Sequence, residues 1–446
     1  MGAAVTPGRP LWLEDIERRD RPPLPGDTRA DVCIVGAGFT GLWAALGVLE
    51  REPDASVVVV EQAFAGFGAS GRNGGWCSAL FPVSGAELVR RHGRDAAIRM
   101  RTALHDTVDE VGRAGAALGI DFDYVKGGTH SLVRSATARL AAEAEIEDAV
   151  ALGLPAPEWR DRAPLGTTLF DPQCARISPG KLVGGLAVAA EQRGVRIHEG
   201  TRVLDVHPHE VLTEHGVVRA ARVVVAAEAW AARLPGFRRR VLPLYSLMIA
   251  TEPLPESAWA SIGLEHGETV TDFRHLLVYG QRTADDRLAF GGRGARYHLG
   301  STVKPQWDVS PRVFAHLERT LGELFPAAAG ARITHRWGGP IGVPRDWHPA
   351  VVPLSGGIVW AGGYVGDGIA AANLAGRTIA DLVTDRRTPL TALPWVGHVP
   401  PRWEPEPLRV LAVNAVVAAS GVADAEERFT GAPSRVAGAL SRLGLR

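Results

Sequence analysis

The chain has 446 residues, of which 46% are hydrophobic and 22% are charged, and its 49 Lys and Arg side chains balance 49 Asp and Glu side chains. This length allows two or three domains, or two large interleaved ones, with a sizeable core. A neutral balance provides no net field toward nucleic acid or an anionic membrane, so neither partner is expected.

Residues 1–28 are rich in Pro and Arg and predict an extended N-terminal arm. They contain no cationic region followed by an apolar run, so no signal peptide is expected. No run of 18 apolar residues occurs, and we therefore expect no membrane-spanning helix. The three cysteines, Cys33, Cys77 and Cys174, are scattered without a CxxC pair, which indicates no disulfide framework and no metal site and favours a reducing, cytoplasmic compartment.

The first clear element is a short apolar run at 31–35, which predicts a buried parallel strand. Gly36, Gly38 and Gly41 follow at once in the spacing GxGxxG, and residues 42–50 continue at helical spacing. In such a turn the first glycine allows the tight bend, the second lets a pyrophosphate approach, and the third lets the helix pack against the strand. The helix N-terminus then faces the phosphates.

A second apolar run, SVVVVEQ, ends in Glu61 and Gln62, and Glu61 stands 20 residues after Gly41. A carboxylate at this distance can accept hydrogen bonds from ribose hydroxyls. Strand, glycine turn, helix, strand and acid in this order predict a dinucleotide-binding unit. The pattern alone does not separate NAD from FAD, but a cofactor fold that opens near the N-terminus is typical of flavoproteins.

The stretch FGASGRNGGW, residues 67–76, contains four glycines and ends in Trp76. Glycines this dense let main-chain N–H groups crowd against something flat or anionic. Further along, the sequence predicts several more elements in chain order. These are a strand at 128–134, a helix at 136–152, a helix and two strands within 179–206, a buried strand at 221–230, a strand at 246–252, a hairpin with its turn at 283–287, a helix at 312–325, a strand, Gly-rich turn and helix within 357–383, and an amphipathic helix at 407–420 ahead of a charged turn.

Rival sites are weakly supported. His207 and His209 share one face of a strand, but no third metal ligand can be named, and a solvated strand edge explains them better. Neither GxSxG nor HExxH occurs, so hydrolase chemistry has no support.

The motifs taken together resemble the FAD-dependent amine and amino-acid oxidase family of the D-amino acid oxidase and glycine oxidase type. The nearest branch resembles the gamma-glutamylputrescine oxidase-like proteins, which share GASGRNGG. The resemblance covers roughly residues 25–400 and rests on DVCIVGAGFTGLWAAL, VVVVEQ, GASGRNGG, TRVLDV, VVVAAEAW and GGYVGDGIAAANLAGRTIADL.

This resemblance implies an α/β fold with a Rossmann-like FAD-binding domain and an interleaved substrate domain centred on an antiparallel sheet. The implied FAD-binding pieces are 29–90, 170–240 and 335–400, and the implied substrate domain is 91–169 and 241–334. Residues 401–446 are expected to form a C-terminal helical extension that packs on the outside or at an interface.

The resemblance also implies that FAD lies along glycines, small side chains and the ribose-binding acid. The implied contacts are Gly36, Gly38, Phe39, Thr40, Gly41, Glu61, Gln62, Ser70, Gly71, Arg72, Asn73, Gly74, Gly75, Val203, Ala226, Ala227, Gly363, Tyr364, Gly366, Gly368 and Ile369. The chain departs from the family pattern at Glu228, where relatives usually carry Gly. Because a carboxylate would repel the cofactor phosphates, Glu228 is expected to point outward or to meet an Arg.

The implied reaction is the oxidation of the C–N bond of a small-molecule amine. Hydride passes from the carbon bearing the amine to flavin N5, water hydrolyses the imine, and O2 or another acceptor reoxidises the flavin. The residues implied near the reacting atoms are Trp76, Arg293, His348 and Tyr364. A flavin dehydrogenase that passes electrons to a carrier stays open as an alternative, and so does a non-catalytic or NAD-binding Rossmann protein.

Three further expectations come from departures within the resemblance. Relatives that attach flavin covalently use a Cys or His where this chain has Gly339 and Asn73, so FAD is expected to be bound non-covalently. Relatives that react with O2 through a Lys near N5 have no Lys counterpart here, and Arg293 is the cation near that register. Relatives that bind a small amino acid hold its carboxylate with two cations, where this chain has Trp76 and Ala370. We therefore expect an amine, or an amine with a distant acid group, unless Arg293 or Arg296 reaches the substrate.

Overall fold

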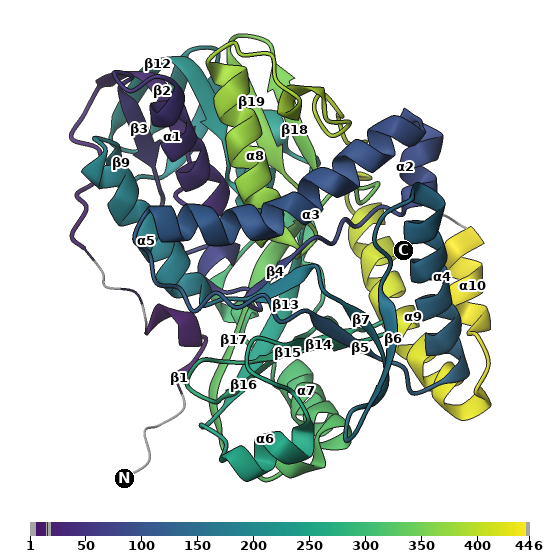
Figure 1. Cartoon of the computed structure of the whole chain (residues 1–446). Helices are drawn as coiled ribbons and strands as arrows, with labels where there is room; N and C mark the ends of the chain where they lie inside the picture. The colour runs from purple at the N-terminus through teal and green to yellow at the C-terminus, as the bar shows by residue number, and fades with distance from the viewer. Residues whose placement is uncertain (1–5, 15, 17–18, 443–446) are drawn as a thin grey trace.

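The computed structural model describes residues 6–14, 16 and 19–442. Two sheets lie one above the other in Figure 1, the Rossmann-like part above and a larger sheet below. The predicted α/β class, with a Rossmann-like domain and a second sheet domain, is confirmed.

The Rossmann-like sheet has a parallel centre in the order β19, β12, β2, β3 and β9. Antiparallel strands β10, β11 and β18 extend it. Its strands are β2 (Thr28–Val35), β3 (Val57–Val60), β9 (Arg196–His198), β10 (Val203–His207), β11 (Glu210–Thr213), β12 (Gly216–Val225), β18 (Ala350–Leu354) and β19 (Ile358–Gly362). The runs of Val and Ile at the centre of this sheet are buried on both faces, as parallel strands require. The predicted strand at 31–35 is confirmed within β2. The strand predicted within 221–230 is confirmed up to Val225, where β12 ends, and a turn of 3-10 helix follows at Glu228–Arg233.

Helices α1 (Phe39–Arg51), α5 (Pro179–Gln192) and α8 (Gly368–Val383) pack with this sheet in one core. All three were predicted, although α1 begins three residues before the predicted segment 42–50. Helix α3 (Arg94–Ala117) belongs to the same core through Met100 and Leu104. The guanidinium of Arg377 on α8 donates to the hydroxyl of Thr107 on α3 over 2.7 Å. The predicted boundary, which placed residues 91–169 in the substrate domain, is therefore wrong for α3.

The second sheet has nine strands in the order β1-β17-β13-β16-β15-β14-β5-β7-β6 and is mostly antiparallel. They are β1 (Thr6–Pro7), β17 (Ile333–Val343), β13 (Leu242–Thr251), β16 (Leu288–Gly292), β15 (Val278–Arg282), β14 (Thr269–Asp272), β5 (Thr129–Leu132), β7 (Gly166–Asp171) and β6 (Glu158–Arg162). The predicted hairpin with its turn at 283–287 is confirmed by β15 and β16. Strand β17 pairs with β13 along its whole length, so it belongs to this sheet and not to the FAD-binding piece that was predicted to begin at 335.

Helices α6 (Glu256–Ile262) and α7 (Pro311–Leu324) pack on this sheet, and Leu317 of α7 contacts its apolar side chains. Helices α2 (Gly85–His92) and α4 (Ala136–Leu152) lie at one side, and β4 (Trp76–Ser78) pairs with β8 (Cys174–Arg176) between the two parts. The N-terminal arm is more than an extended lead-in, because β1 pairs with β17 and Trp12 is buried against Trp337.

The C-terminal extension forms α9 (Leu408–Thr430) and α10 (Arg435–Arg442), drawn in yellow at the right of Figure 1. The residues predicted to form a charged turn after 420 continue the helix instead. Helix α9 has 23 residues, and an 18-residue window within it has a mean hydropathy of 1.5, so by length and composition alone it could cross a membrane. The expectation that no helix of this kind exists is therefore not confirmed.

Candidate functional site

A cavity of about 350 Å³ lies between the two sheets, at the carboxyl ends of β2, β3, β12 and β19. This edge is where open α/β sheets bind ligands. Strands β13, β14, β15 and β17 of the second sheet supply the other wall. The cavity therefore has the Rossmann-like turn at one end and the antiparallel sheet at the other.

The glycines of the β2–α1 turn are fixed by close main-chain approach. Gly36 has a φ of +107°, and a Cβ there would lie 2.6 Å from the carbonyl oxygen of Ala226. A Cβ on Gly41 would lie 2.0 Å from the carbonyl oxygen of Gly36, so Gly41 serves helix packing. A Cβ on Gly38 would meet only the Ser70 hydroxyl, at 2.9 Å, and Gly38 itself lines the cavity. The three roles predicted from the spacing correspond to these three environments.

Glu61 follows β3, and its carboxylate lies in the cavity wall. One carboxylate oxygen accepts from the N–H of Ala37 over 3.0 Å, and the other accepts from the N–H of Ala63 over 2.9 Å. Burial raises the pKa of Glu61 despite these two donors. Each carboxylate oxygen retains a lone pair that can accept from a ribose hydroxyl.

The glycine-rich stretch 67–76 forms a tight turn under the cavity. The hydroxyl of Ser70 accepts from the N–H of Phe39 in the first turn of α1, over 2.9 Å. The amide of Asn73 donates to the carbonyls of Ala69 and Ser70 and accepts from the N–H of Gly75. Asn73 therefore shapes the turn with its side chain, and the turn presents its main chain to the cavity.

Arg72 has a structural role in this turn. Its guanidinium donates to Asp308 over 2.5 Å, to the carbonyl of Gly338 over 3.0 Å and to the carbonyl of Phe67 over 2.7 Å. The main-chain carbonyl of Arg72 accepts from the indole of Trp337. The buried Arg72 thus ties the turn to β17 and to the residues before α7.

Glu228 contradicts the expectation that it points outward or meets an Arg. Its carboxylate turns inward and accepts from the main-chain N–H groups of Gly363 over 2.7 Å, Gly342 over 3.2 Å and Tyr364 over 3.4 Å. Burial raises its pKa to about 7, although the three donors lower it. Glu228 therefore joins the segment after β12 to β17 and to the loop after β19. The N–H of Gly363, which was predicted to contact FAD, donates to Glu228 instead.

Two aromatic side chains define the substrate side of the cavity, opposite Glu61. Trp76 and Tyr279 meet edge to face with their ring centroids 6.0 Å apart. The Tyr279 hydroxyl shares a 2.8 Å hydrogen bond with the hydroxyl of Ser246, and burial raises its pKa. The indole N–H of Trp76 is buried without a hydrogen-bond partner among the described residues.

Arg293 and Asp367 bring opposite charges to the same side. Both line the cavity, and within the described part of the chain neither has an ion-pair partner within 4.0 Å. Burial raises the pKa of Asp367 to about 6, and Arg293 opposes this rise. Burial also lowers the pKa of Arg293, and Asp367 opposes that change. Asp367 precedes α8 at the N-cap position, but its side chain makes no capping bond.

His348 lies outside the cavity. Its ring is fully buried against His92, His398 and Phe81, and its Nδ1 donates to the carbonyl of Pro349 over 2.7 Å. Burial lowers its pKa to about 4. This placement gives His348 a packing role and does not support the catalytic role implied by the resemblance.

Most of the residues assigned to FAD line the cavity. Those that do are Gly36, Gly38, Phe39, Thr40, Glu61, Gln62, Ser70, Arg72, Asn73, Gly74, Val203, Ala226, Ala227, Tyr364, Gly366, Gly368 and Ile369. Gly41, Gly71, Gly75 and Gly363 lie behind the wall, where they allow close packing or donate within the chain. Of the catalytic candidates, Trp76, Arg293 and Tyr364 line the cavity.

Sequence reasoning missed Asp367, Tyr279 and Ser246. Asp367 stands inside the Gly-rich sequence YVGDG, where a carboxylate before a helix is ordinarily read as a cap. Tyr279 and Ser246 sit on strands that were predicted, but the facing of each strand could not be fixed without its partner in the sheet.

These features fit FAD. The turn at Gly36 and Gly38 and the N-terminus of α1 form a cradle for a pyrophosphate, which a Cβ at position 38 would narrow. Glu61 provides the ribose acceptor. The turn 67–76 and the loop before α8 line the space between the cradle and Trp76.

The fold and the cavity together define a Rossmann-like flavoprotein whose cofactor lies under an antiparallel sheet. The chain belongs to the family described as FAD dependent oxidoreductase, whose sequence model matches residues 31–382. FAD is therefore its cofactor, and the family predicted from the sequence is confirmed.

Relatives and solved structures agree with this assignment. The chain is 31% identical over 380 residues to the probable oxidoreductase OrdL of Haemophilus influenzae, covering 81% of this chain and 84% of the relative. It is 30% identical over 387 residues to the gamma-glutamylputrescine oxidoreductase of Escherichia coli, covering 83% and 87%. The crystal structure of glycine oxidase from Geobacillus kaustophilus shares the fold, with a TM-score of 0.69 and 22% identity over 83% of this chain and all of that one.

Proposed function

We propose that the protein oxidises the C–N bond of a small substrate that carries both an amine and a carboxylate. When bound, FAD accepts the hydride that leaves the carbon bearing the amine, and water then hydrolyses the resulting imine. The Escherichia coli relative, whose name gives an amine as its substrate, supports this reaction class. The observation that carries the substrate class is the unpaired charges of Arg293 and Asp367 in one cavity.

Burying a charge without a partner is costly, so a cavity that keeps two such charges apart is suited to a ligand with the complementary pair. The guanidinium of Arg293 can bind a carboxylate with two parallel hydrogen bonds. Above pH 6 Asp367 is mainly ionised, so it can hold an ammonium group and accept the proton that this group loses before hydride transfer. The protein thereby binds the carboxylate of a zwitterionic substrate at Arg293 and its ammonium group at Asp367.

Trp76 and Tyr279 position the alkyl segment of the substrate between its two charged ends. Their apolar faces exclude water from an alkyl segment, and an aromatic face attracts an ammonium by about 0.5–2 kcal/mol. Trp76 and Ala370 occupy positions where related enzymes hold the carboxylate of a small amino acid. We therefore expect substrates whose carboxylate is separated from the reacting carbon, and poor binding of glycine or sarcosine.

Anaerobic reduction of the enzyme-bound flavin tests this proposal with matched compounds. Butylamine, 4-aminobutyrate, gamma-glutamylputrescine and glycine differ in the presence and distance of the carboxylate. We expect faster reduction at limiting concentration by the two amines with a distant carboxylate than by butylamine, and little reduction by glycine. If butylamine and 4-aminobutyrate reduced the flavin at equal rates, Arg293 would have no role in binding a substrate carboxylate. If no amine reduced the flavin, the reaction class would be rejected.

Two variants separate the two charges. Arg293→Met should raise KM for 4-aminobutyrate at least about tenfold and leave butylamine unaffected, because it removes the carboxylate partner alone. Asp367→Asn should weaken the binding of both 4-aminobutyrate and butylamine, because both compounds contain the amine. Arg296→Met is the matched control, since Arg296 is exposed and does not line the cavity.

The acceptor that reoxidises the flavin is a separate question, and a dehydrogenase is the second candidate. None of Lys126, Lys181 and Lys304 lines the cavity, and Arg293 is the cation on its substrate side. We expect either slow reaction of the reduced enzyme with O2 or a fast reaction that depends on Arg293. Stopped-flow reoxidation by O2 of the wild type and of Arg293→Ala distinguishes these, and a fast reaction that Arg293→Ala leaves unchanged would reject both.

A further inference from the structure

One face of α9 carries an exposed apolar repeat. Its members, which we call the α9 seam, alternate in steps of three and four residues and are all exposed: Leu408, Leu411, Ala415, Ala418, Val422, Ala425 and Phe429. The large ones are 60%, 66%, 56% and 88% exposed at Leu408, Leu411, Val422 and Phe429. An exposed helix face in a soluble protein is ordinarily charged, and this one has no charged member.

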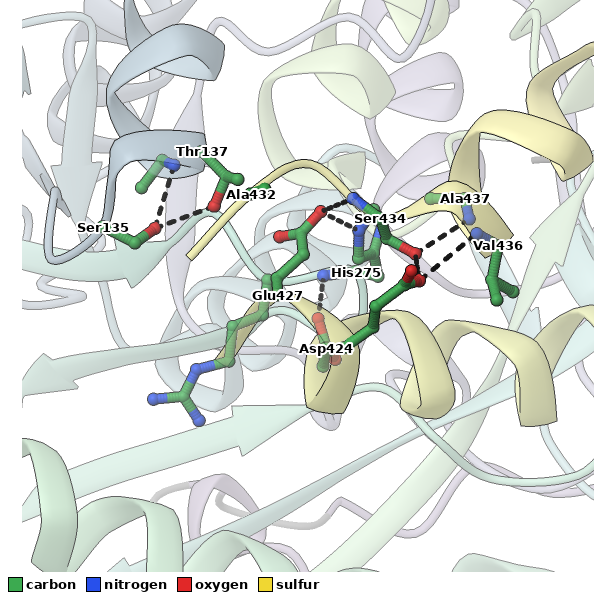
Figure 2. A network of polar contacts seen from close by, with 12 residues as sticks. Ser135, Thr137, His275, Asp424, Glu427, Ala432, Ser434, Val436 and Ala437 are labelled. Atoms are coloured by element: carbon green, nitrogen blue, oxygen red, sulfur yellow. Dashed lines mark hydrogen bonds and ion pairs between the residues drawn. The ribbon is translucent and has the colours of Figure 1, made fainter. Parts of the chain in front are cut away.

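The opposite face of α9 holds the helix on the protein through buried Val413 and Ala423 and through polar bonds. Asn414 exchanges two hydrogen bonds with the main chain of Tyr297, at 2.9 and 3.0 Å. Asp424 accepts from the main-chain N–H groups of His275 and Leu276 at 2.7 and 3.0 Å. Figure 2 shows His275 between Asp424 and Glu427, whose carboxylate lies 3.1 Å from the His275 ring. These contacts fix the inward face of α9 and leave the exposed seam outward.

The end of α9 is fixed as well. Glu426 accepts from the Ser434 hydroxyl over 2.5 Å and from the N–H of Val436 over 3.3 Å, and these bonds hold α10 against α9. The N–H of Ser434 donates to Glu427 over 3.0 Å. Because both ends of the helix are held, the seam cannot turn toward the protein without breaking these bonds.

The period of the seam indicates a helical partner. Apolar residues that recur every 3.5 positions form the contact line of paired helices, whereas a helix that lies in a bilayer needs a wider apolar face. The positions that flank the seam near its C-terminal end include Glu426 and Arg428, whose charges are unsuited to lipid. Alanines at the centre of the seam allow two helix backbones to approach closely.

The seam complements itself when a second copy runs antiparallel. A two-fold axis at residues 416–417 places Leu408 against Ala425, Leu411 against Val422 and Ala415 against Ala418 of the other copy. A two-fold contact needs this kind of reciprocal match.

We propose that two copies of this chain associate through antiparallel pairing of their α9 helices. None of the seam residues lines the flavin cavity. The side chains of Leu408, Leu411 and Val422 of each copy leave water on association, which drives the pairing.

Sedimentation of the holoenzyme over a range of concentrations tests this. We expect a dimer that the double variant Leu411→Glu/Val422→Glu weakens at least 100-fold, with unchanged FAD content and flavin reduction. Leu140→Glu on α4 is the matched control, since Leu140 is equally exposed at 56% but lies off the seam. A monomer at every concentration overturns the proposal, as does a dimer that the double variant leaves intact, or a monomer that binds lipid vesicles through the seam.

Cross-linking tests the direction of pairing. All three native cysteines are buried, so an introduced thiol on α9 is the accessible one. Leu411→Cys and Val422→Cys proteins should form disulfide-linked dimers when mixed, and neither should do so efficiently alone, because 11 residues, about 16 Å along the helix, separate the two positions. Efficient cross-linking of each variant alone would overturn the antiparallel arrangement.

Discussion

Glu228 shows how one side chain sets the relation between the two sheets. The residue has a φ of +42°, which directs its carboxylate into a group of three main-chain donors. Three N–H donors favour the ionised carboxylate, but complete burial favours the neutral one and is the larger effect. The balance leaves the pKa at about 7, near physiological pH.

This balance predicts a pH dependence of stability. The folded state binds the Glu228 proton more tightly than the unfolded state does, so ionisation of this group lowers the free energy of unfolding as pH rises from about 4.5 to 7. Glu228→Gln removes this ionisation. Between pH 5 and 8 the free energy of unfolding of the wild type should therefore fall by roughly 2–3 kcal/mol relative to that of the variant. Chemical denaturation of both holoenzymes across that range measures it. A constant difference would show that Glu228 does not titrate.

Gly38 and Gly41 stand three residues apart but predict different failures. A Cβ at Gly38 meets a movable hydroxyl, whereas one at Gly41 meets a main-chain oxygen at 2.0 Å. Gly38→Val should therefore fold and lose FAD, and Gly41→Val should not fold.

Glu61→Ala should weaken the binding of FAD by about 1.5–3 kcal/mol, because it removes only charge-assisted hydrogen bonds. This loss should be smaller than the loss caused by Gly38→Val. Flavin absorbance after gel filtration measures retention, and normal FAD content in Gly38→Val would refute the pyrophosphate assignment.

At the scale of elements, α1 and α8 are held together by an ion pair at their ends. Arg51 of α1 donates to Asp381 of α8 over 2.5 Å, and Asp381 also accepts from the hydroxyl of Thr388 over 2.6 Å. Since α8 begins at the cavity and α1 begins at the phosphate cradle, this pair keeps the two helix N-termini in register.

We expect Asp381→Ala to lower the free energy of unfolding by about 3–5 kcal/mol, because it leaves the largely buried Arg51 without its charge partner. Asp385→Ala is the matched control. Asp385 pairs with Arg222 over 2.7 Å, but its side chain is 77% exposed, so a loss of at most about 1 kcal/mol is expected. Urea titration of both variants makes the comparison, and equal losses would contradict the role of the buried pair.

Elements differed in how well the sequence predicted them, and α3 shows why. Its buried residues Ala97, Met100, Leu104, Val108 and Val111 have helical spacing, so the helix itself was detectable. Its partner α8 lies more than 250 residues later, and helical spacing does not say which sheet a helix covers. The β2–α1–β3 unit, by contrast, was predicted correctly because strand, turn and helix are neighbours in the chain.

At the scale of the whole molecule, the same distinction separates the two ends of the cavity. The cradle for FAD depends on residues close in sequence. The roles of Arg72 and Glu228 depend on Asp308 and Gly363, which lie 236 and 135 residues away. Sequence spacing alone could not reveal these partners. For this reason Arg72 was predicted to contact FAD, whereas its guanidinium binds Asp308.

The whole cavity also predicts how FAD is attached. No Cys or His is among its lining residues in the described part of the chain, and the three cysteines are buried elsewhere. FAD should therefore be non-covalent, and acid precipitation should release all of the yellow colour into the supernatant. Flavin absorbance in the washed pellet measures any covalent fraction, and colour retained there would refute this.

The bond between Trp337 and the carbonyl of Arg72 also sets an order of events during synthesis. The glycine-rich turn leaves the ribosome early, but its anchors at Asp308, Gly338 and Trp337 follow more than 230 residues later. At about 5–20 residues per second, that interval lasts roughly 10–50 s. Throughout that time the turn beneath the flavin lacks its supports, so a nascent chain cannot complete its cofactor site until about three-quarters of it has been made.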